Sequence, residues 1–206
     1  MAELNTISIK AEYDVSIKGS MFKSIVVGTD SPKHIKKIIN KYKIKYNKAS
    51  HVCYAYRICD NYDLFNNPII VEYSTDAGEP SGTAGKPILN VLKSCNVINS
   101  ILIVVRYFGG TKLGISGLID AYKKASIGVL DNAVFKKWKI YEKIKIVYSY
   151  KIQKIINKQL LDFDCIDIVS EYDENITTSF KIEIKNKKDM LNVFNEKSNG
   201  TILIVE

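Results

Sequence analysis

Two short glycine-rich stretches constrain this chain most, because they hold seven of its eleven glycines and each stands directly before a predicted helix. The first, DAGEPSGTAGKP, covers residues 76–87, and the second, RYFGGTKLGISG, covers residues 106–117. Glycine lets backbone N–H groups turn toward a common point, and the first turn of a helix adds unpaired donors with partial positive charge. Both stretches therefore predict loops that can hold an anion such as a phosphate group.

Basic side chains stand at both loops. Lys86 ends the first, Arg106 and Lys112 belong to the second, and Arg57 joins them if its strand is adjacent. Such side chains give fixed positive charge to phosphate oxygens. The candidate phosphate- or nucleic-acid-binding residues are Arg57, Asp76, Gly78, Glu79, Gly82, Thr83, Gly85, Lys86, Arg106, Gly109, Gly110, Lys112 and Gly114.

The spacing excludes two common nucleotide-binding motifs. Lys86 is followed by Pro87 instead of Ser or Thr, so the first loop is not a Walker loop, and the GxGxxG fingerprint is absent. The four cysteines show no CxxC spacing and there are two histidines, which argues against a zinc or iron site built by the protein. We therefore expect no cofactor and no bound metal.

Catalysis is a second interpretation of the first loop. Asp76 and Glu79 could together hold a magnesium ion against a bound phosphate; alternatively, Asp76 closes a turn and Glu79 pairs with Arg106 or caps a helix. His51 and Cys53 resemble a base and a nucleophile, but alternate strand residues lie roughly 7 Å apart, beyond hydrogen-bond reach. No catalytic residue is identified, and a non-enzymatic role is preferred.

The net charge of +8 lies entirely in the N-terminal part of the chain. Residues 139–206 contain as many acids as lysines, whereas residues 31–50 contain seven lysines and no acid. This segment predicts a helix with Ser31 as its cap and with a patch of basic residues, Lys33, Lys36, Lys37 and Lys41. The patch is either a solvated helix face or a surface for RNA or the ribosome, because unneutralised lysines repel one another unless a polyanion is present.

The pattern of strands and helices predicts a mixed α/β (α+β) protein with two domains, residues 1–137 and 138–206. The second reads as β-α-β-β-α-β, the ferredoxin-like order. The longest uninterrupted apolar run, Ile101–Val105, is too short to cross a bilayer, and the N-terminus lacks the apolar segment of a secretory signal. We therefore expect a cytoplasmic protein that does not contact membranes.

The segments KGSMF, HVCYAYR, DAGEPSGTAGKPIL and VVRYFGGTKLGISGLIDAY together resemble the IMPACT family and its bacterial YigZ-like branch over roughly residues 12–130. The resemblance implies an N-terminal domain of the superfamily that includes a ribosomal small-subunit protein domain and domain IV of elongation factor G. It also implies a ferredoxin-like C-terminal domain. Met21 departs from the family pattern, in which a basic residue commonly follows KGS.

Eukaryotic members of this family regulate translation, and they carry an additional N-terminal RWD domain that this chain is expected to lack. The resemblance therefore implies a cytoplasmic protein that acts in translation or its regulation by contacting RNA or ribosomal components. No signal specific for DNA is present. The alternative is a metal-assisted enzyme acting on a phosphorylated small molecule, with Asp76 and Glu79 as metal ligands and Arg106 as the phosphate clamp.

Overall fold

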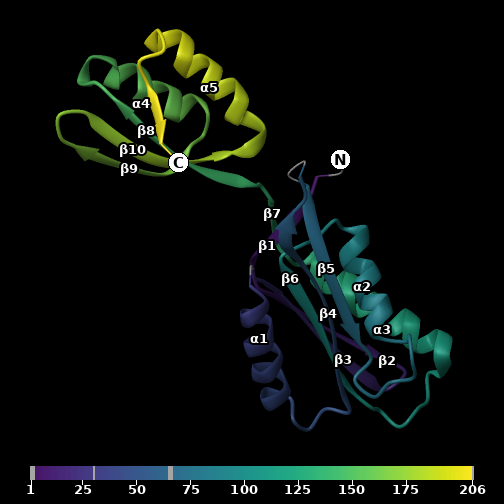
Figure 1. The fold of residues 1–206 in the computed structure, drawn as a ribbon. Helices are drawn as coiled ribbons and strands as arrows, with labels where there is room; N and C mark the ends of the chain where they lie inside the picture. The colour runs from purple at the N-terminus through teal and green to yellow at the C-terminus, as the bar shows by residue number, and fades with distance from the viewer. Residues whose placement is uncertain (1–2, 30, 65–66, 206) are drawn as a thin grey trace. The chain divides into compact units, whose positions relative to one another are not determined.

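The computed structural model describes residues 3–29, 31–64 and 67–205, and it confirms the mixed α/β class (Figure 1). The chain divides into two compact units, residues 1–138 and 139–206. Each unit has its own buried apolar core. None of the described helices is long and apolar enough to cross a membrane.

The N-terminal unit is built on a five-stranded antiparallel sheet with the order β2-β3-β6-β4-β5. Its strands are β2 (Ala11–Ile17), β3 (Ser20–Gly28), β4 (His51–Tyr62), β5 (Pro68–Thr75) and β6 (Ser100–Tyr107). The hairpin between β2 and β3 turns at Lys18 and Gly19, which both have positive φ, as a two-residue hairpin loop requires. Strands β1 (Asn5–Ile9) and β7 (Val134–Lys137) form a separate antiparallel pair.

Helices cover both faces of this sheet (Figure 1). Helix α1 (Pro32–Lys45) packs on one face, and α2 (Gly85–Ser94) and α3 (Gly114–Asp131) pack on the other. Central strand β6 is buried on both sides: Leu102 and Val104 face α2 and α3, whereas Ile101, Ile103 and Val105 face α1. Burial on both sides explains why the strand reads as a continuous apolar run instead of alternating.

Helix α1 forms as the sequence predicts. The Ser31 side chain accepts a hydrogen bond from the backbone N–H of Lys33, which satisfies one of the orphan donors of the first turn. Ile35, Tyr42 and Tyr46 are buried against the sheet. The helix therefore holds its lysines on the side turned away from the core.

The C-terminal unit has the element order β-α-β-β-α-β, with a four-stranded antiparallel sheet of order β11-β8-β10-β9. Its core is formed around Ile146, Phe180, Met190 and Phe194. The elements are β8 (Tyr141–Tyr148), the 3-10 turn η1 (Tyr150–Ile152), α4 (Gln153–Asp162), β9 (Ile166–Tyr172), β10 (Ile176–Glu183), α5 (Ile184–Ser198) and β11 (Leu203–Val205). This topology is that of a ferredoxin-like sheet.

The register of the first sheet brings both glycine-rich loops to one end. His51, the first residue of β4, pairs with Arg106 near the end of β6, and Met21 of β3 pairs with Tyr107. Tyr54 of β4 pairs with Thr75, where β5 ends and the first glycine-rich loop begins. The loop before α2 and the loop before α3 therefore meet at the same edge, although they are about thirty residues apart in sequence.

Candidate functional site at the glycine-rich loops

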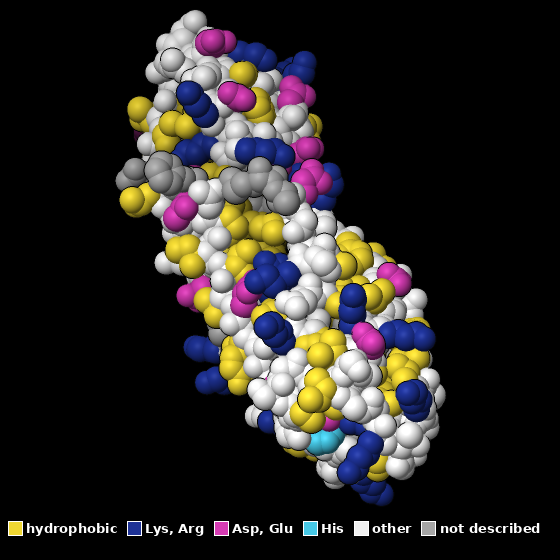
Figure 2. All heavy atoms as spheres, turned by 90° about the vertical axis from the view of Figure 1, so that its right-hand side faces the viewer, with side chains coloured by type: hydrophobic (Ala, Val, Ile, Leu, Met, Phe, Trp, Pro, Cys, Tyr) yellow, Lys and Arg dark blue, Asp and Glu magenta, His cyan; other side chains and the backbone are white. Residues whose placement is uncertain are grey.

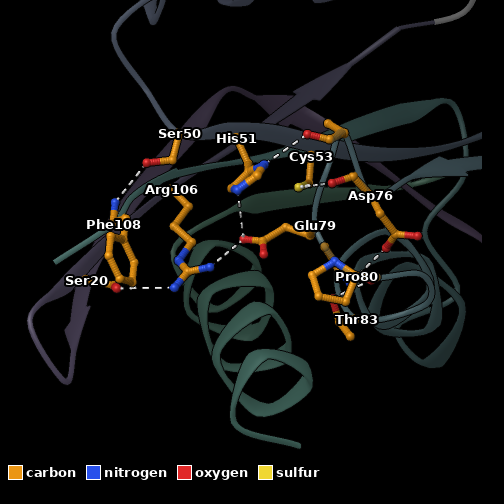
Figure 3. Close-up of polar contacts among 12 residues, drawn as sticks. Ser20, Ser50, His51, Cys53, Asp76, Glu79, Pro80, Thr83, Arg106 and Phe108 are labelled. Carbon is orange, nitrogen blue, oxygen red and sulfur yellow. Dashed lines mark hydrogen bonds and ion pairs between the residues drawn. The ribbon is translucent and has the colours of Figure 1, made fainter. Parts of the chain in front are cut away.

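The site is centred on the buried carboxylate of Glu79 (Figure 3). Its Oε1 lies 2.7 Å from Nη1 of Arg106 and accepts a hydrogen bond of 2.8 Å from the hydroxyl of Tyr122. Nε2 of His51 lies 3.9 Å from the same oxygen, and its Nδ1 lies 3.0 Å from the carbonyl oxygen of Ala77. Pairing with Arg106 is one of the three roles that the sequence allows for Glu79, beside magnesium binding and helix capping.

Arg106 is held in place from several sides. Its guanidinium lies between the rings of Phe22 and Phe108, 5.6 and 5.5 Å from their centroids. Nη2 donates a long hydrogen bond of 3.4 Å to the hydroxyl of Ser20, and Nε has no partner among the described residues. The side chain is thus a fixed cation whose Nε is enclosed by protein atoms.

Tyr122 connects the ion pair to Cys53. Cys53 Sγ lies 3.3 Å from the Tyr122 hydroxyl and 3.0 Å from the carbonyl oxygen of Asp76. Burial raises the pKa of Cys53 to about 12, and burial together with nearby Cys53 and Glu79 raises the pKa of Tyr122 as well. Both groups are therefore protonated at neutral pH, so Cys53 is not an activated nucleophile.

Asp76 organises the first glycine-rich loop from inside. Its carboxylate accepts backbone N–H bonds from Gly82 at 2.9 Å, Ala84 at 2.9 Å and Gly85 at 2.8 Å. Burial by itself would raise the pKa of Asp76, but these three bonds outweigh it and hold the pKa below its usual value. The backbone N–H groups before and at the start of α2 are therefore already bound to an anion, the carboxylate of Asp76.

Gly78 and Thr83 also shape this loop. Gly78 has a φ of +91°, and its backbone lies so close to the His51 ring that a Cβ would stand 3.3 Å from Nδ1. The buried hydroxyl of Thr83 donates a 2.7 Å hydrogen bond to the carbonyl oxygen of Pro80. Both residues hold the loop in the conformation that presents Glu79 to Arg106.

The second glycine-rich loop is more open. Gly109, Gly110, Lys112 and Gly114 are exposed, and no side chain caps helix α3 within the described part of the chain. The loop is tied to its neighbours by two hydroxyl groups that accept backbone N–H bonds. The hydroxyl of Ser50 accepts from Phe108 at 3.0 Å (Figure 3), and that of Ser20 accepts from Gly109 at 3.2 Å.

A cavity of about 290 Å³ lies at this second loop. Four of the predicted site residues line this cavity: Glu79, Arg106, Lys112 and Gly114. Its other lining residues are Pro80, Phe108, Leu113, Ile115 and Leu118. The cavity therefore combines two cationic side chains, an apolar wall and the uncapped start of α3, and it suits a small anionic group better than the first loop does.

Arg57 does not belong to this site, which corrects the sequence-based assignment. Strand β4 does lie beside β6, but Arg57 pairs with Ser100 at the opposite end of β6 from Arg106. Its Nε donates to Glu72 at 2.9 Å and its Nη1 to the carbonyl oxygen of Val97 at 3.0 Å. Arg57 is therefore a buried structural cation.

Lys86 is also separated from the second loop. It is exposed on α2 and, together with Gly82 and Lys123, lines a different cavity of about 550 Å³ between α2 and α3. Figure 2 shows the N-terminal unit from the side of these helices, with lysine or arginine side chains interspersed among hydrophobic ones. The predicted basic patch lies on α1, across the sheet from both cavities.

The two carboxylates considered as magnesium ligands have separate partners, since Asp76 binds backbone N–H groups and Glu79 binds Arg106 and Tyr122. Among residues 3–29, 31–64 and 67–205, no group of three or more His, Cys, Asp and Glu side chains is arranged to hold a metal ion. No local pattern signals the roles of Tyr122, Ser20 and Ser50, because these roles arise from contacts across the fold.

Comparison with known proteins agrees with this fold. Residues 18–130 match the Impact N-terminal domain, and this match covers more than half of the chain. The chain is 29% identical to the IMPACT family member YvyE of Bacillus subtilis over 95% of this chain and 87% of that protein. It is also 36% identical to the IMPACT family member YigZ of Escherichia coli, over 52% of this chain and 50% of that protein.

Among solved structures, a crystal structure described as that of a hypothetical protein superposes with a TM-score of 0.66 at 23% identity, covering 100% of this chain and 97% of that one. At this identity the likeness shows the fold alone. The domain match, which contains both glycine-rich loops and the buried pair of Arg106 and Glu79, shows the family. The chain belongs to the IMPACT family.

Proposed function

We propose that this protein acts in translation or its regulation by binding RNA, including ribosomal RNA, through its basic N-terminal unit. One observation carries the proposal: the lysines of α1 are exposed, and no acid occurs between residues 31 and 50 to neutralise them. A polyanion relieves the repulsion among such lysines and releases its own counterions on binding. Membership of the IMPACT family, whose eukaryotic members regulate translation, supports placing this binding in translation.

The cavity at the second glycine-rich loop supplies a proposed anchor for one phosphate group. Arg106 is rigidly positioned there by Phe22 and Phe108 and lines the cavity, and the exposed Lys112 contributes a second positive charge. A phosphate oxygen can accept hydrogen bonds both from a guanidinium and from the N–H groups at the start of a helix. The α1 lysines then provide attraction that does not depend on RNA sequence, and the loop fixes one backbone position.

Cosedimentation with purified ribosomes at low and at moderate salt tests the proposal. Binding should weaken steeply as salt is added, and replacing Lys36, Lys37 and Lys41 by Glu should weaken it further. The matched control replaces Lys151, Lys154 and Lys158, which are equally exposed lysines of the C-terminal unit, by Glu. An equal loss in both triple variants would show that only net charge matters and would remove α1 from the interface.

Lys112→Ala tests the anchor separately, because Lys112 is exposed and its removal leaves the buried ion pair intact. Binding to ribosomes should weaken at both salt concentrations. Absence of ribosome and RNA binding by the wild-type protein would reject the proposed function as a whole. The enzymatic alternative is not favoured by the geometry, since both carboxylates that it requires as metal ligands have structural partners.

A further inference from the structure

On the sheet face that carries α1, Tyr73 is exposed at the β5 edge, beside Tyr54 and Tyr56 of β4, which are half-buried against the α1 core. Tyr56 of β4 pairs with Tyr73 of β5. Tyr54 precedes Tyr56 by two residues on β4 and therefore lies on the same face of the sheet. The ring centroids of Tyr56 and Tyr73 are 5.4 Å apart with an angle of 20° between the planes. For Tyr54 and Tyr73 the values are 6.0 Å and 29°. We call Tyr54, Tyr56 and Tyr73 the tyrosine platform.

The tyrosine platform continues into an exposed apolar strip along β5. Tyr73 is 46% exposed, and Val71 and Ile69, which alternate with inward-facing residues on the same strand, are 43% and 49% exposed. Helix α1 buries its own apolar residues against Ile25, Ile103 and the other residues of that core, and it does not cover this strip. Contiguous exposed aromatic and aliphatic side chains of this kind mark an interaction site more often than a solvated surface.

One flank of α1 is turned toward the strands that carry the tyrosine platform. Lys45 lies on the flank of α1 that is turned toward β2. A hydrogen bond from Lys10 and the nearby charge of Lys45 together lower the pKa of Glu12, which belongs to β2. Lys36 and Lys43 are seven residues apart and so share a flank, on the other side of the buried stripe from Lys45. Since β2 and β5 are opposite edges of the sheet, this flank is turned toward β4 and β5.

We propose that the tyrosine platform stacks unpaired bases of single-stranded RNA while Lys36 and Lys43 contact the sugar-phosphate backbone. This inference rests on the proposed function and names the form of RNA that is bound. Aromatic side chains on an open sheet face bind splayed bases in several classes of RNA-binding domain, because every base has a stacking surface. Duplex RNA cannot use such a face, since its bases are stacked within the helix.

Charge favours RNA over a second copy of this chain as the occupant. Two copies that meet at this face would bring their α1 lysines together, whereas an RNA strand neutralises them. The acid on β5, Glu72, faces the other side of the sheet, where it pairs with Arg57 and Lys93. The tyrosine platform therefore offers stacking surfaces on the sheet face toward which the Lys36 and Lys43 flank of α1 is turned.

Fluorescence anisotropy with a labelled oligouridylate of about twelve nucleotides, beside a duplex RNA of the same length, tests this inference. Tyr73→Ala should weaken single-strand binding about tenfold, which is within the range measured for one lost base stack, and should change duplex binding less than about twofold. Tyr73→Phe keeps the ring and should bind as the wild type does. Tyr172→Ala removes an exposed tyrosine from an edge strand of the C-terminal unit and serves as the control.

The outcomes separate this inference from the proposed function. If the wild type binds both RNAs with a steep salt dependence and Tyr73→Ala binds single strands unchanged, the platform is rejected and the proposed function stands. If neither RNA binds, both are rejected. If Tyr73→Ala converts a dimer into a monomer in sedimentation analysis, the face is a contact between copies and the inference is overturned. Tyr73→Thr, which suits a strand and lacks a ring, replaces the alanine variant should that variant fail to fold.

Discussion

Arg106 and Glu79 form a buried ion pair that joins the end of β6 to the loop before α2, with 2.7 Å between Nη1 and Oε1. Both side chains are almost completely buried. The pair connects the two glycine-rich loops, so a change in either partner acts on both loops together. Its contribution to the free energy of unfolding can be measured separately from ligand binding.

Replacing Glu79 by Gln should lower the free energy of unfolding by about 3 kcal/mol, because the guanidinium of Arg106 then remains buried without a counter-charge. Chemical denaturation at neutral pH measures this loss. The control is Glu12→Gln, which breaks an exposed pair with Lys10 and should cost less than about 1 kcal/mol. Equal losses in the two variants would mean that the buried pair contributes no more than a surface pair.

Replacing Asp76 by Asn should destabilise the protein at neutral pH by about 2 kcal/mol, since a neutral amide binds three N–H groups less strongly than a carboxylate does. The pKa of Asp76 is lowered in the folded state. Its ionised form therefore stabilises the fold above the unfolded pKa near 3.9, and this stabilisation is lost as pH falls through the folded pKa.

Unfolding curves between pH 6 and pH 2 check the pH dependence. Stability of the wild type should fall more steeply with acid than that of Asp76→Asn, so the difference between the two should narrow as pH decreases. Asp120→Asn, a change at an exposed position of α3, is the control. A constant difference over the whole range would show that the charge of Asp76 is not what organises the loop.

Replacing Gly109 by Ala should destabilise the N-terminal unit by on the order of 3 kcal/mol, because backbone atoms would have to move. A Cβ at this position would lie 1.9 Å from the carbonyl oxygen of Gly19. Gly82→Ala should cost only about 1 kcal/mol, since it introduces a positive-φ strain without any neighbour within 4 Å. Thermal unfolding of both variants compares the two costs, and a larger loss for Gly82→Ala would contradict this packing argument.

Cys53 should resist alkylation by iodoacetamide in the folded protein, whereas Cys95 should react. Cys53 is buried with its pKa raised to about 12, and Cys95 is exposed. Because the thiolate is the reactive form, both burial and the raised pKa slow the reaction of Cys53. Mass spectrometry of peptides after timed labelling measures the alkylation rate of each cysteine. Equal rates for Cys53 and Cys95 in the folded protein would contradict the burial of Cys53 against Asp76 and Tyr122.

Local pattern alone determined most of the elements of this protein. The apolar run of β6, the Ser31 cap and the apolar stripe of α1, and the two glycine-rich loops before α2 and α3 are visible in sequence because strand alternation, helical periodicity and turn chemistry act over a few residues. The β-α-β-β-α-β order of the second unit is visible for the same reason.

Only the tertiary structure decided which residues meet. Strand register places Arg57 opposite Ser100, at the other end of β6, and brings His51 beside Arg106, although local alternation puts His51 and Arg57 on the same face. Tyr122 of α3 joins the buried pair from 43 residues away, and this contact has no local signal. The physical reason is that helix and strand formation depend on near neighbours, whereas burial, charge pairing and access to a ligand depend on atoms that packing brings together across the whole fold.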